Sequence, residues 1–190
     1  MDAHETLARI GFVYNVKHFR RLDRLDNHAR PLPARLARLH GADYGLLDED
    51  EVHNLMPTEG LNYLLDVAIR AQSQLTAWYI GIFEGNYTPV LADTAATFPG
   101  SATESTAYAE STRQAYTIVA ASGGVLTNAA SPAVFTMNAS KTIYGGFISS
   151  ASAKSATTGK ICSAAQFSSS KAVVSTDVLS ITATITLTSS

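Results

Sequence analysis

The sequence is poor in cysteine, in histidine beyond its first third and in long apolar runs. Its 190 residues include a single cysteine, Cys162, which excludes a disulfide scaffold. A chain of this length can bury roughly 65 to 70% of its unfolded surface, enough for a core without cross-links. The longest apolar stretches, 115–121 and 78–83, fall far short of the about 18 residues that a membrane span needs. Residues 1–5 lack the charged and apolar regions of a secretion signal, so we expect neither export nor a membrane partner.

Charged residues are distributed unevenly along the chain. All five histidines, nine of the 14 basic residues and eleven of the 16 acidic residues lie in residues 1–75. The last 115 residues hold five basic and five acidic residues but 36 serines and threonines. This division predicts two regions, a charged N-terminal arm over residues 1–53 and a β domain over residues 54–190.

The arm is the predicted partner-binding region. Its first forty residues carry eight basic against four acidic residues, and arginine suits bidentate pairing with acidic protein surfaces. The candidate contacts are five arginines for charge and three aromatic residues for apolar burial: Arg20, Arg21, Arg24, Arg35, Arg38, Phe12, Tyr14 and Phe19. The Pro31-Leu32-Pro33 run, followed by leucines at helical spacing, predicts a short helix over 33–40 that ends at Gly41.

The same basic block is the nucleic-acid candidate of the sequence, because aromatic residues suited to stacking lie near it. Asp23 and Asp26 interrupt the block, however, and the chain has a formal net charge of -2. We therefore expect the arm to bind protein, and we do not expect direct binding to nucleic acid.

A helix is predicted at the start of the β domain, over about residues 58–73. Thr58 is a capping residue type, and Glu59 suits the positive end of the helix dipole. Apolar residues then recur at helical spacing and form one stripe: Leu61, Leu64, Leu65, Ala68 and Ile69. We expect this stripe to be buried.

The remainder of the chain has the pattern of short strands. Segments rich in β-branched and aromatic residues lie at 78–83, 116–119, 133–137, 142–148 and 178–187. From Leu179 to Leu187 apolar residues alternate with Ser and Thr, which predicts one buried and one hydroxyl-rich face. Turn signals about every ten residues predict a mainly β fold, an antiparallel β-sandwich or jelly roll with one or two short α-helices.

Little in the β region favours catalysis. It contains no histidine, and its acids are scattered: Glu84, Asp93, Glu104, Glu110 and Asp177. Cys162 follows an isoleucine in a predicted strand, which favours a small buried thiol over a nucleophile. The histidines His4, His18, His28, His40 and His53 are too far apart for a short zinc motif, and no glycine pair carries the Lys-Ser/Thr of a phosphate loop. We expect no enzymatic activity, no metal and no cofactor.

Several segments resemble, in order and spacing, a group of tailed-bacteriophage virion proteins. These segments are NLMPTEGLNYLLD at 54–66, WYIG at 78–81, ASGG at 121–124, Asn128 with ASPAVFTMNA at 130–139, GFISS at 146–150 and KSATTG at 154–159. The resemblance covers about residues 53–188, and some members of the group resemble decoration or cement proteins of icosahedral heads. It implies a β-sandwich or jelly roll, often trimeric, without catalytic residues. Residues 20–50 depart from the group, whose members lead from a short strand almost directly to the Asn54-Leu55 segment.

The leading hypothesis is a capsid decoration protein on the outer surface of the head, made in the host cytoplasm. Its expected partners are the major capsid protein and further copies of the chain, as a trimer or alternatively a dimer. The second hypothesis is a tail, neck or fibre component that serves attachment. The third is a carbohydrate-binding or carbohydrate-active virion module, for which Glu104 or Glu110 would be required.

Overall fold

The structure is a computed structural model, which describes residues 9–21, 30–31 and 44–188. The described strands are β1 (Arg9–Arg21), β2 (Arg30–Pro31), β3 (Tyr44–His53), β4 (Tyr79–Phe83), β5 (Gln114–Ala115), β6 (Val125–Thr127), β7 (Ala133–Thr136), β8 (Lys141–Ser149), β9 (Ile161–Val173) and β10 (Val178–Thr188). Two helices accompany them, α2 (Thr58–Ile69) and α3 (Phe98–Ser101). The helix predicted over 33–40 lies outside the described residues.

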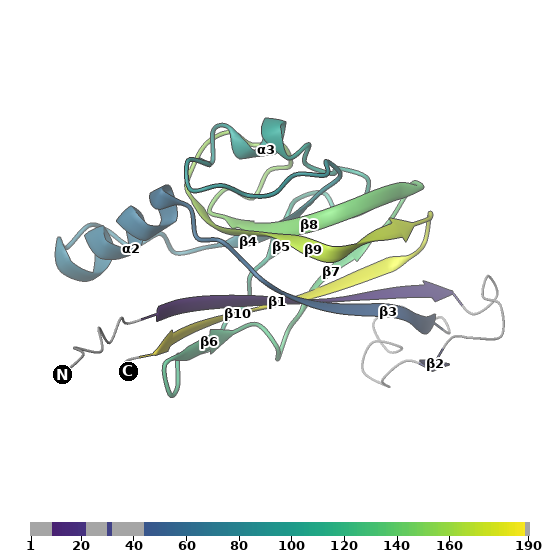
Figure 1. Cartoon of the computed structure of the whole chain (residues 1–190), viewed down its shortest axis with the longest axis horizontal. Coiled ribbons are helices and arrows are strands. Elements are labelled where there is room, and N and C mark those ends of the chain that lie inside the picture. The colour runs from purple at the N-terminus through teal and green to yellow at the C-terminus, as the bar shows by residue number, and fades with distance from the viewer. Residues whose placement is uncertain (1–8, 22–29, 32–43, 189–190) are drawn as a thin grey trace, which may run out of the picture.

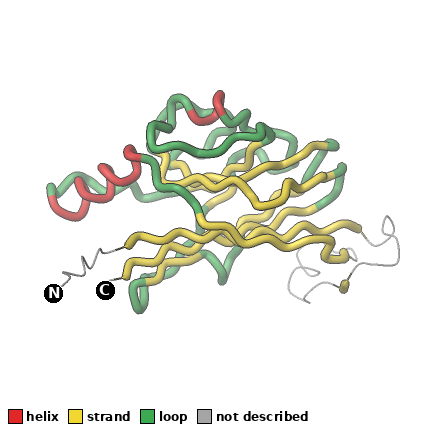
Figure 2. The backbone as a smooth tube through the Cα atoms, in the orientation of Figure 1, coloured by secondary structure: helices red, strands yellow, loops and turns green. Residues whose placement is uncertain are grey.

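The strands form two antiparallel sheets packed face to face (Figure 1). In the first sheet the order is β2-β3-β1-β10-β6. β7 pairs with the same edge of β10 as β6 does, but with the first residues of that strand. The order in the second sheet is β5-β4-β8-β9. Strands dominate the backbone, as Figure 2 shows, so the prediction of a mainly β sandwich is confirmed. The jelly-roll connectivity stays a prediction.

Residues 9–21 and 44–53 are not part of an arm outside the β domain, so the predicted boundary at 53 is wrong. β1 pairs with β10 along eleven positions, from Arg9 opposite Thr188 to Phe19 opposite Val178. Its other edge pairs with β3, which makes β1 an interior strand. The reason is visible in the sequence of β1, where Phe12, Tyr14 and Val16 alternate with outward residues and bury a continuous apolar face.

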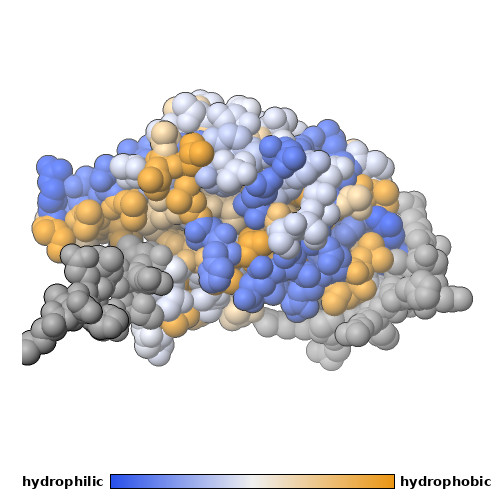
Figure 3. All heavy atoms as spheres, viewed as in Figure 1, coloured by the Kyte–Doolittle hydropathy of each residue, from blue (hydrophilic) through white to orange (hydrophobic). Residues whose placement is uncertain are grey.

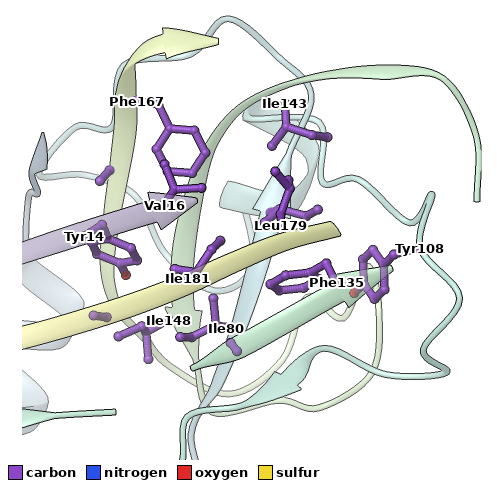
Figure 4. Close-up of a cluster of buried hydrophobic side chains, with 14 of the residues drawn as sticks. Tyr14, Val16, Ile80, Tyr108, Phe135, Ile143, Ile148, Phe167, Leu179 and Ile181 are labelled. Atoms are coloured by element: carbon purple, nitrogen blue, oxygen red, sulfur yellow. The ribbon is translucent and has the colours of Figure 1, made fainter. Parts of the chain in front are cut away.

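The main core lies between the two sheets. Inward residues of β1 and β10 meet residues of β4, β8 and β9 from the second sheet, as Figure 4 shows for Tyr14, Ile181 and Ile148. The apolar residues predicted to be buried in the first half of β10 are buried, because Leu179, Ile181 and Ala183 are fully covered, but Ser180 on the predicted surface face is also buried, at 5% exposed. The predicted burial fails at Leu187, which is 52% exposed.

Most predicted strands are present within one or two residues of their expected bounds. The strand predicted at 116–119 is wrong, since β5 ends at Ala115 and the following residues form a loop. β9 is the longest strand of the second sheet, and the sequence predicted only that Cys162 lies in a strand. A bulge between β8 and β9 releases residues 167–170 from the ladder and turns them toward β3. There the Asp50 carboxylate accepts hydrogen bonds from Ser168 Oγ and the Ser169 amide.

Helix α2 begins at Thr58 as predicted, but it ends at Ile69 rather than near residue 73, and its N-cap is Pro57 rather than Thr58. Its apolar stripe is not buried. Only its first turns pack on the sandwich, where an added Cβ at Gly60 would lie 2.6 Å from the Cys162 carbonyl oxygen. Beyond Tyr63 the helix projects past the end of the sheets (Figure 1). Leu65 is 59% exposed and Ile69 is 79% exposed, because no described part of the fold extends far enough to cover them.

Candidate partner-binding surface

The three aromatic residues predicted to contact a partner are in the core. Phe12, Tyr14 and Phe19 are each at most 3% exposed. Phe12 and Tyr14 lie on the inward face of β1, whereas Phe19 follows a register shift and packs in a separate cluster with Tyr44 and Val178. The Tyr14 hydroxyl shares a hydrogen bond of 2.7 Å with Ser163 Oγ of β9, and burial raises its pKa well above the ordinary value of 10.0. All three side chains are buried within the fold, and Tyr14 lies in the core between the sheets, so their assignment as contact residues is corrected.

Arg20 is tied to the opposite end of the chain. Its Nη2 lies 2.7 Å from Asp177 Oδ2, and His18 Nε2 lies 2.8 Å from the same oxygen. Burial alone raises the pKa of Asp177, but hydrogen bonds from His18, Arg20 and the Val174 amide outweigh it and hold that pKa below 3.8. Arg20 therefore fastens β1 to the turn before β10.

The other four predicted arginines divide into one described residue and three undescribed ones. Arg21 ends β1 opposite Tyr44, the first residue of β3, and its side chain is partly exposed. Arg24, Arg35 and Arg38 lie outside the described residues. β1 ends beside the start of β3, and the short strand β2 between them in the sequence pairs with β3 at the same end of the first sheet.

A surface that the sequence reasoning missed lies at the other end of the sandwich. An apolar groove of about 500 Å³ runs between α2 and the strand ends. Its walls are mostly aliphatic and aromatic: Tyr63, Leu64, Val67, Leu75, Trp78, Tyr116, Ile118, Leu126, Ile148 and Ile185. In Figure 3 hydrophobic atoms follow one side of α2 and hydrophilic atoms the other. The apolar stripe of α2 was a partial signal, since Leu64 and Ala68 of that stripe line the groove.

The two tyrosine hydroxyls of this groove already form hydrogen bonds within the fold. The Tyr63 hydroxyl accepts a hydrogen bond from the Leu75 amide at 2.6 Å, and the Tyr116 hydroxyl donates to the Ala183 carbonyl at 3.0 Å. Burial raises the pKa of the Cys162 thiol, which also lines the groove, to about 12, so the thiolate is suppressed. The groove therefore offers apolar contact rather than polar recognition or nucleophilic chemistry.

The two carboxylates of the carbohydrate hypothesis are engaged in structural contacts. Glu104 forms a buried pair with Arg113, with Nη2 to Oε2 at 2.6 Å and Nε to Oε1 at 2.8 Å. Both oxygens of Glu110 accept hydrogen bonds from the Thr136 amide at 3.1 Å. Each carboxylate thus stabilises a loop, and neither is presented as an open acid.

Within the described ranges, no three or more His, Cys, Asp or Glu side chains gather closely enough to hold a metal ion. None of the helices described is both long enough and apolar enough to cross a membrane.

Comparison with known proteins adds no family to this description. No protein-family model matches the chain, and neither does any curated protein or solved structure.

Proposed function

We propose that the chain is a phage capsid decoration protein that binds and stabilises the assembled head. The observation that carries the proposal is the two-sheet body of the chain. Residues 53–188, which resemble tailed-phage virion proteins, supply β4 to β10 and α2 of that body. The resemblance implies a sandwich, and the described strands form one.

Hydrogen bonds and ion pairs between distant segments of the two-sheet body support a mechanical role. A protein that ties neighbouring subunits together must itself be stiff, and buried ionic contacts join its distant segments. Asp177 connects β10 to β1, and Arg113 connects Glu104 to Ser149 and the Ala151 carbonyl. Glu59 Oε2 accepts hydrogen bonds from the Ala95 amide at 2.9 Å and the Ile161 amide at 2.8 Å. Such contacts fix loops that would otherwise open locally.

The proposed contact with the major capsid protein is residues 22–43. This segment spans from the end of β1 to the start of β3, so both of its ends are anchored in the first sheet. Its sequence contains Arg24, Arg35 and Arg38, which suit bidentate pairing with carboxylates of a capsid surface. Further copies of the chain are a second partner.

Stabilisation of the head would follow from binding linkage. A ligand that binds only the assembled shell lowers its free energy by about 2.7 kcal/mol per site at a hundredfold excess over Kd, and many sites repeat the gain. This requires no chemistry at the surface of the decoration protein.

The test compares heads that carry the protein with heads from a deletion mutant, to which the purified protein is then added back. We expect decorated heads to survive heating and low salt under conditions that open undecorated heads, and add-back to restore survival. Equal survival of the two kinds of head would contradict the cementing role. Add-back of a chain with Arg24, Arg35 and Arg38 changed to Glu is the matched control, and it should restore little.

A further inference from the structure

Lys171 is a buried lysine on the inward face of the second sheet. It lies in β9 opposite Ile143 of β8, and the side chains of directly opposite residues lie on the same face of a sheet. Ile143 belongs to the main core between the sheets. The Lys171 side chain is 0% exposed, which is rare for a lysine unless its ammonium group is paired.

Two carboxylates of the first sheet meet this lysine. Asp48 and Asp50 lie two residues apart in β3, so their side chains lie on the same face of the strand. Asp50 is opposite Val16 of β1, a fully buried core residue, so this face is directed toward the second sheet. Lys171 Nζ donates a hydrogen bond to Asp48 Oδ2 and lies 3.7 Å from Asp50 Oδ2. An amine and a carboxyl group from different sheets are thus in direct contact, beside a second carboxylate.

Two serines of β9 hold these groups in position. Lys171 Nζ donates to Ser169 Oγ at 2.9 Å, while Asp50 accepts hydrogen bonds from Ser168 Oγ at 2.5 Å and from the Ser169 amide at 3.2 Å. Burial alone would raise the pKa of Asp50, but the hydrogen bonds from both serines and the Lys171 charge outweigh it and lower that pKa from 3.8. Asp50 is therefore a carboxylate at neutral pH, and it can accept a proton from a neighbouring ammonium group.

We propose that Lys171 and Asp48 join in an intramolecular isopeptide bond, an amide between Nζ of the lysine and Cγ of the aspartate. Asp50 accepts one proton from the ammonium group, and the neutral amine then attacks Cγ of Asp48. One Cγ–O bond breaks as the Cγ–N bond forms. The departing oxygen takes the proton held by Asp50 and a second proton from Nζ, and it leaves as water. One proton stays on the amide nitrogen, no atom is oxidised or reduced, and no co-reactant is required.

The position of the pair favours the amide over a permanent ion pair. An ion pair held away from water costs desolvation energy, and amide formation removes both charges. Holding the two groups in contact also replaces a bimolecular encounter, which corresponds to an effective concentration of about 10⁵ M or more in well-oriented reactions. The Asp48 side chain is 43% exposed, so the released water has a path to solvent.

The three other lysine–carboxylate pairs found among the described residues lack this setting. They join Lys17 to Glu49, Lys141 to Glu84 and Lys160 to Glu59, and each of these lysine side chains is at least 36% exposed. None of the three lysines is held on the inward face of a sheet as Lys171 is. We therefore expect these pairs to stay ionic, and they provide controls within the same chain.

The bond would tie the two sheets together at one side of the sandwich. β9 is the end strand of the second sheet, and β3 lies next to the two-residue strand β2 at the border of the first. Residues 48–171 would become one covalently closed loop. This inference does not rest on the decoration role, because the bond is measured in purified protein in the absence of heads.

The test is the intact mass of the purified full chain, measured by electrospray mass spectrometry in denaturing solvent. Formation of the amide lowers the mass by about 18 Da, one water, whereas an ion pair leaves the mass unchanged. We expect this deficit in the wild-type chain and its absence in Lys171→Arg and Asp48→Ala. Asp50→Asn should form the bond at least about a hundredfold more slowly, because the proton acceptor is lost. Lys141→Arg, at the exposed pair with Glu84, is the matched control and should keep the deficit.

A tryptic digest locates the bond. Trypsin cleaves after Arg38, Arg70 and Lys160, but it does not cleave after a lysine whose Nζ forms an amide. Residues 39–70 and 161–190 should therefore appear as a single branched peptide that is uncut at Lys171. A wild-type chain with the full mass of its sequence overturns the proposal. So does a deficit that persists in Lys171→Arg, or one that maps to peptides without this lysine.

Discussion

The His18 Nε2 atom lies 2.8 Å from Oδ2 of Asp177, which joins the second half of β1 to the turn that begins β10 across 159 residues of sequence. Arg20 reaches the same carboxylate with Nε and Nη2. The Asp177 side chain is 1% exposed, and its amide and oxygens also close the turn through Val174. This carboxylate therefore adds side-chain contacts between β1 and the turn before β10 to the backbone pairing of the two strands.

Changing Asp177 to Asn should destabilise the fold strongly. The substitution removes the charge that His18 and Arg20 share and leaves these buried or half-buried donors without a carboxylate. We expect a loss of about 3 kcal/mol in the free energy of unfolding, measured by urea denaturation. The control is Glu49→Gln, which removes the exposed pair with Lys17 at 3.1 Å and should cost less than about 1 kcal/mol. Equal losses for the two variants would contradict the assignment.

Stability should fall as the solution becomes acidic, and Asp177 should account for part of the fall. The folded-state pKa values of Asp177 and Asp50 are both below 3.8, because hydrogen bonds to the carboxylates outweigh burial. A depressed folded-state pKa contributes stability that is complete above the unfolded-state pKa and is lost as pH falls through the folded-state pKa. The free energy of unfolding should therefore decrease between about pH 5 and about pH 2. Asp177→Asn should make this decrease shallower, and an unchanged slope would show that the carboxylate is not ionised in the fold.

Gly145 in β8 should tolerate no side chain. An added Cβ would lie 2.1 Å from Phe83 Cζ and 2.2 Å from the Ala165 carbonyl oxygen, so the backbone of the second sheet would have to move. We expect Gly145→Ala to cost about 3 kcal/mol or more in unfolding free energy. Gly11→Ala in β1 is the matched control, because nothing lies within 4 Å of its Cβ position, and it should stay within about 0.5 kcal/mol of wild type. Thermal denaturation of both variants tests the difference.

Arg113 should not be replaceable by Lys. Its guanidinium pairs with Glu104, donates to Ser149 Oγ and to the Ala151 and Ala156 carbonyls, and lies 5.0 Å from the centroid of the Phe147 ring. A lysine ammonium offers three donors without the planar fork, so Arg113→Lys should lose about 2 to 4 kcal/mol. Lys141→Arg, at the exposed pair with Glu84, should change stability by less than about 0.5 kcal/mol in the same denaturation assay. A neutral Arg113→Lys would show that the buried donors are not required.

The sequence predicted the fold class because β4, β7, β8 and β10 can each be identified from the residue types within the strand itself. β1 was missed for a different reason. Its alternation of Phe12, Tyr14 and Val16 stands beside a dense run of charge, and Lys17, Arg20 and Arg21 suggested a solvated arm. Two of these charges are compensated by residues distant in sequence, Glu49 and Asp177, and such pairing depends on tertiary structure.

The candidate surface was predictable only in part. The apolar stripe of α2 was found from its spacing, yet spacing does not say which of its residues the rest of the fold covers. Gly60 allows the first turns to pack closely on β9, whereas Leu65 and Ile69 lie beyond the end of the sheets. The groove beside α2 combines segments from 60 to 185 in the sequence, and no local pattern brings these together.

The copy number of the chain in purified phage particles, measured by quantitative mass spectrometry against the major capsid protein, tests the decoration role most directly. Repeated sites on an icosahedral head predict on the order of hundreds of copies per particle. About six to a few dozen copies would place the chain in the tail, neck or fibre instead. Particles that contain no copies would contradict a virion role altogether.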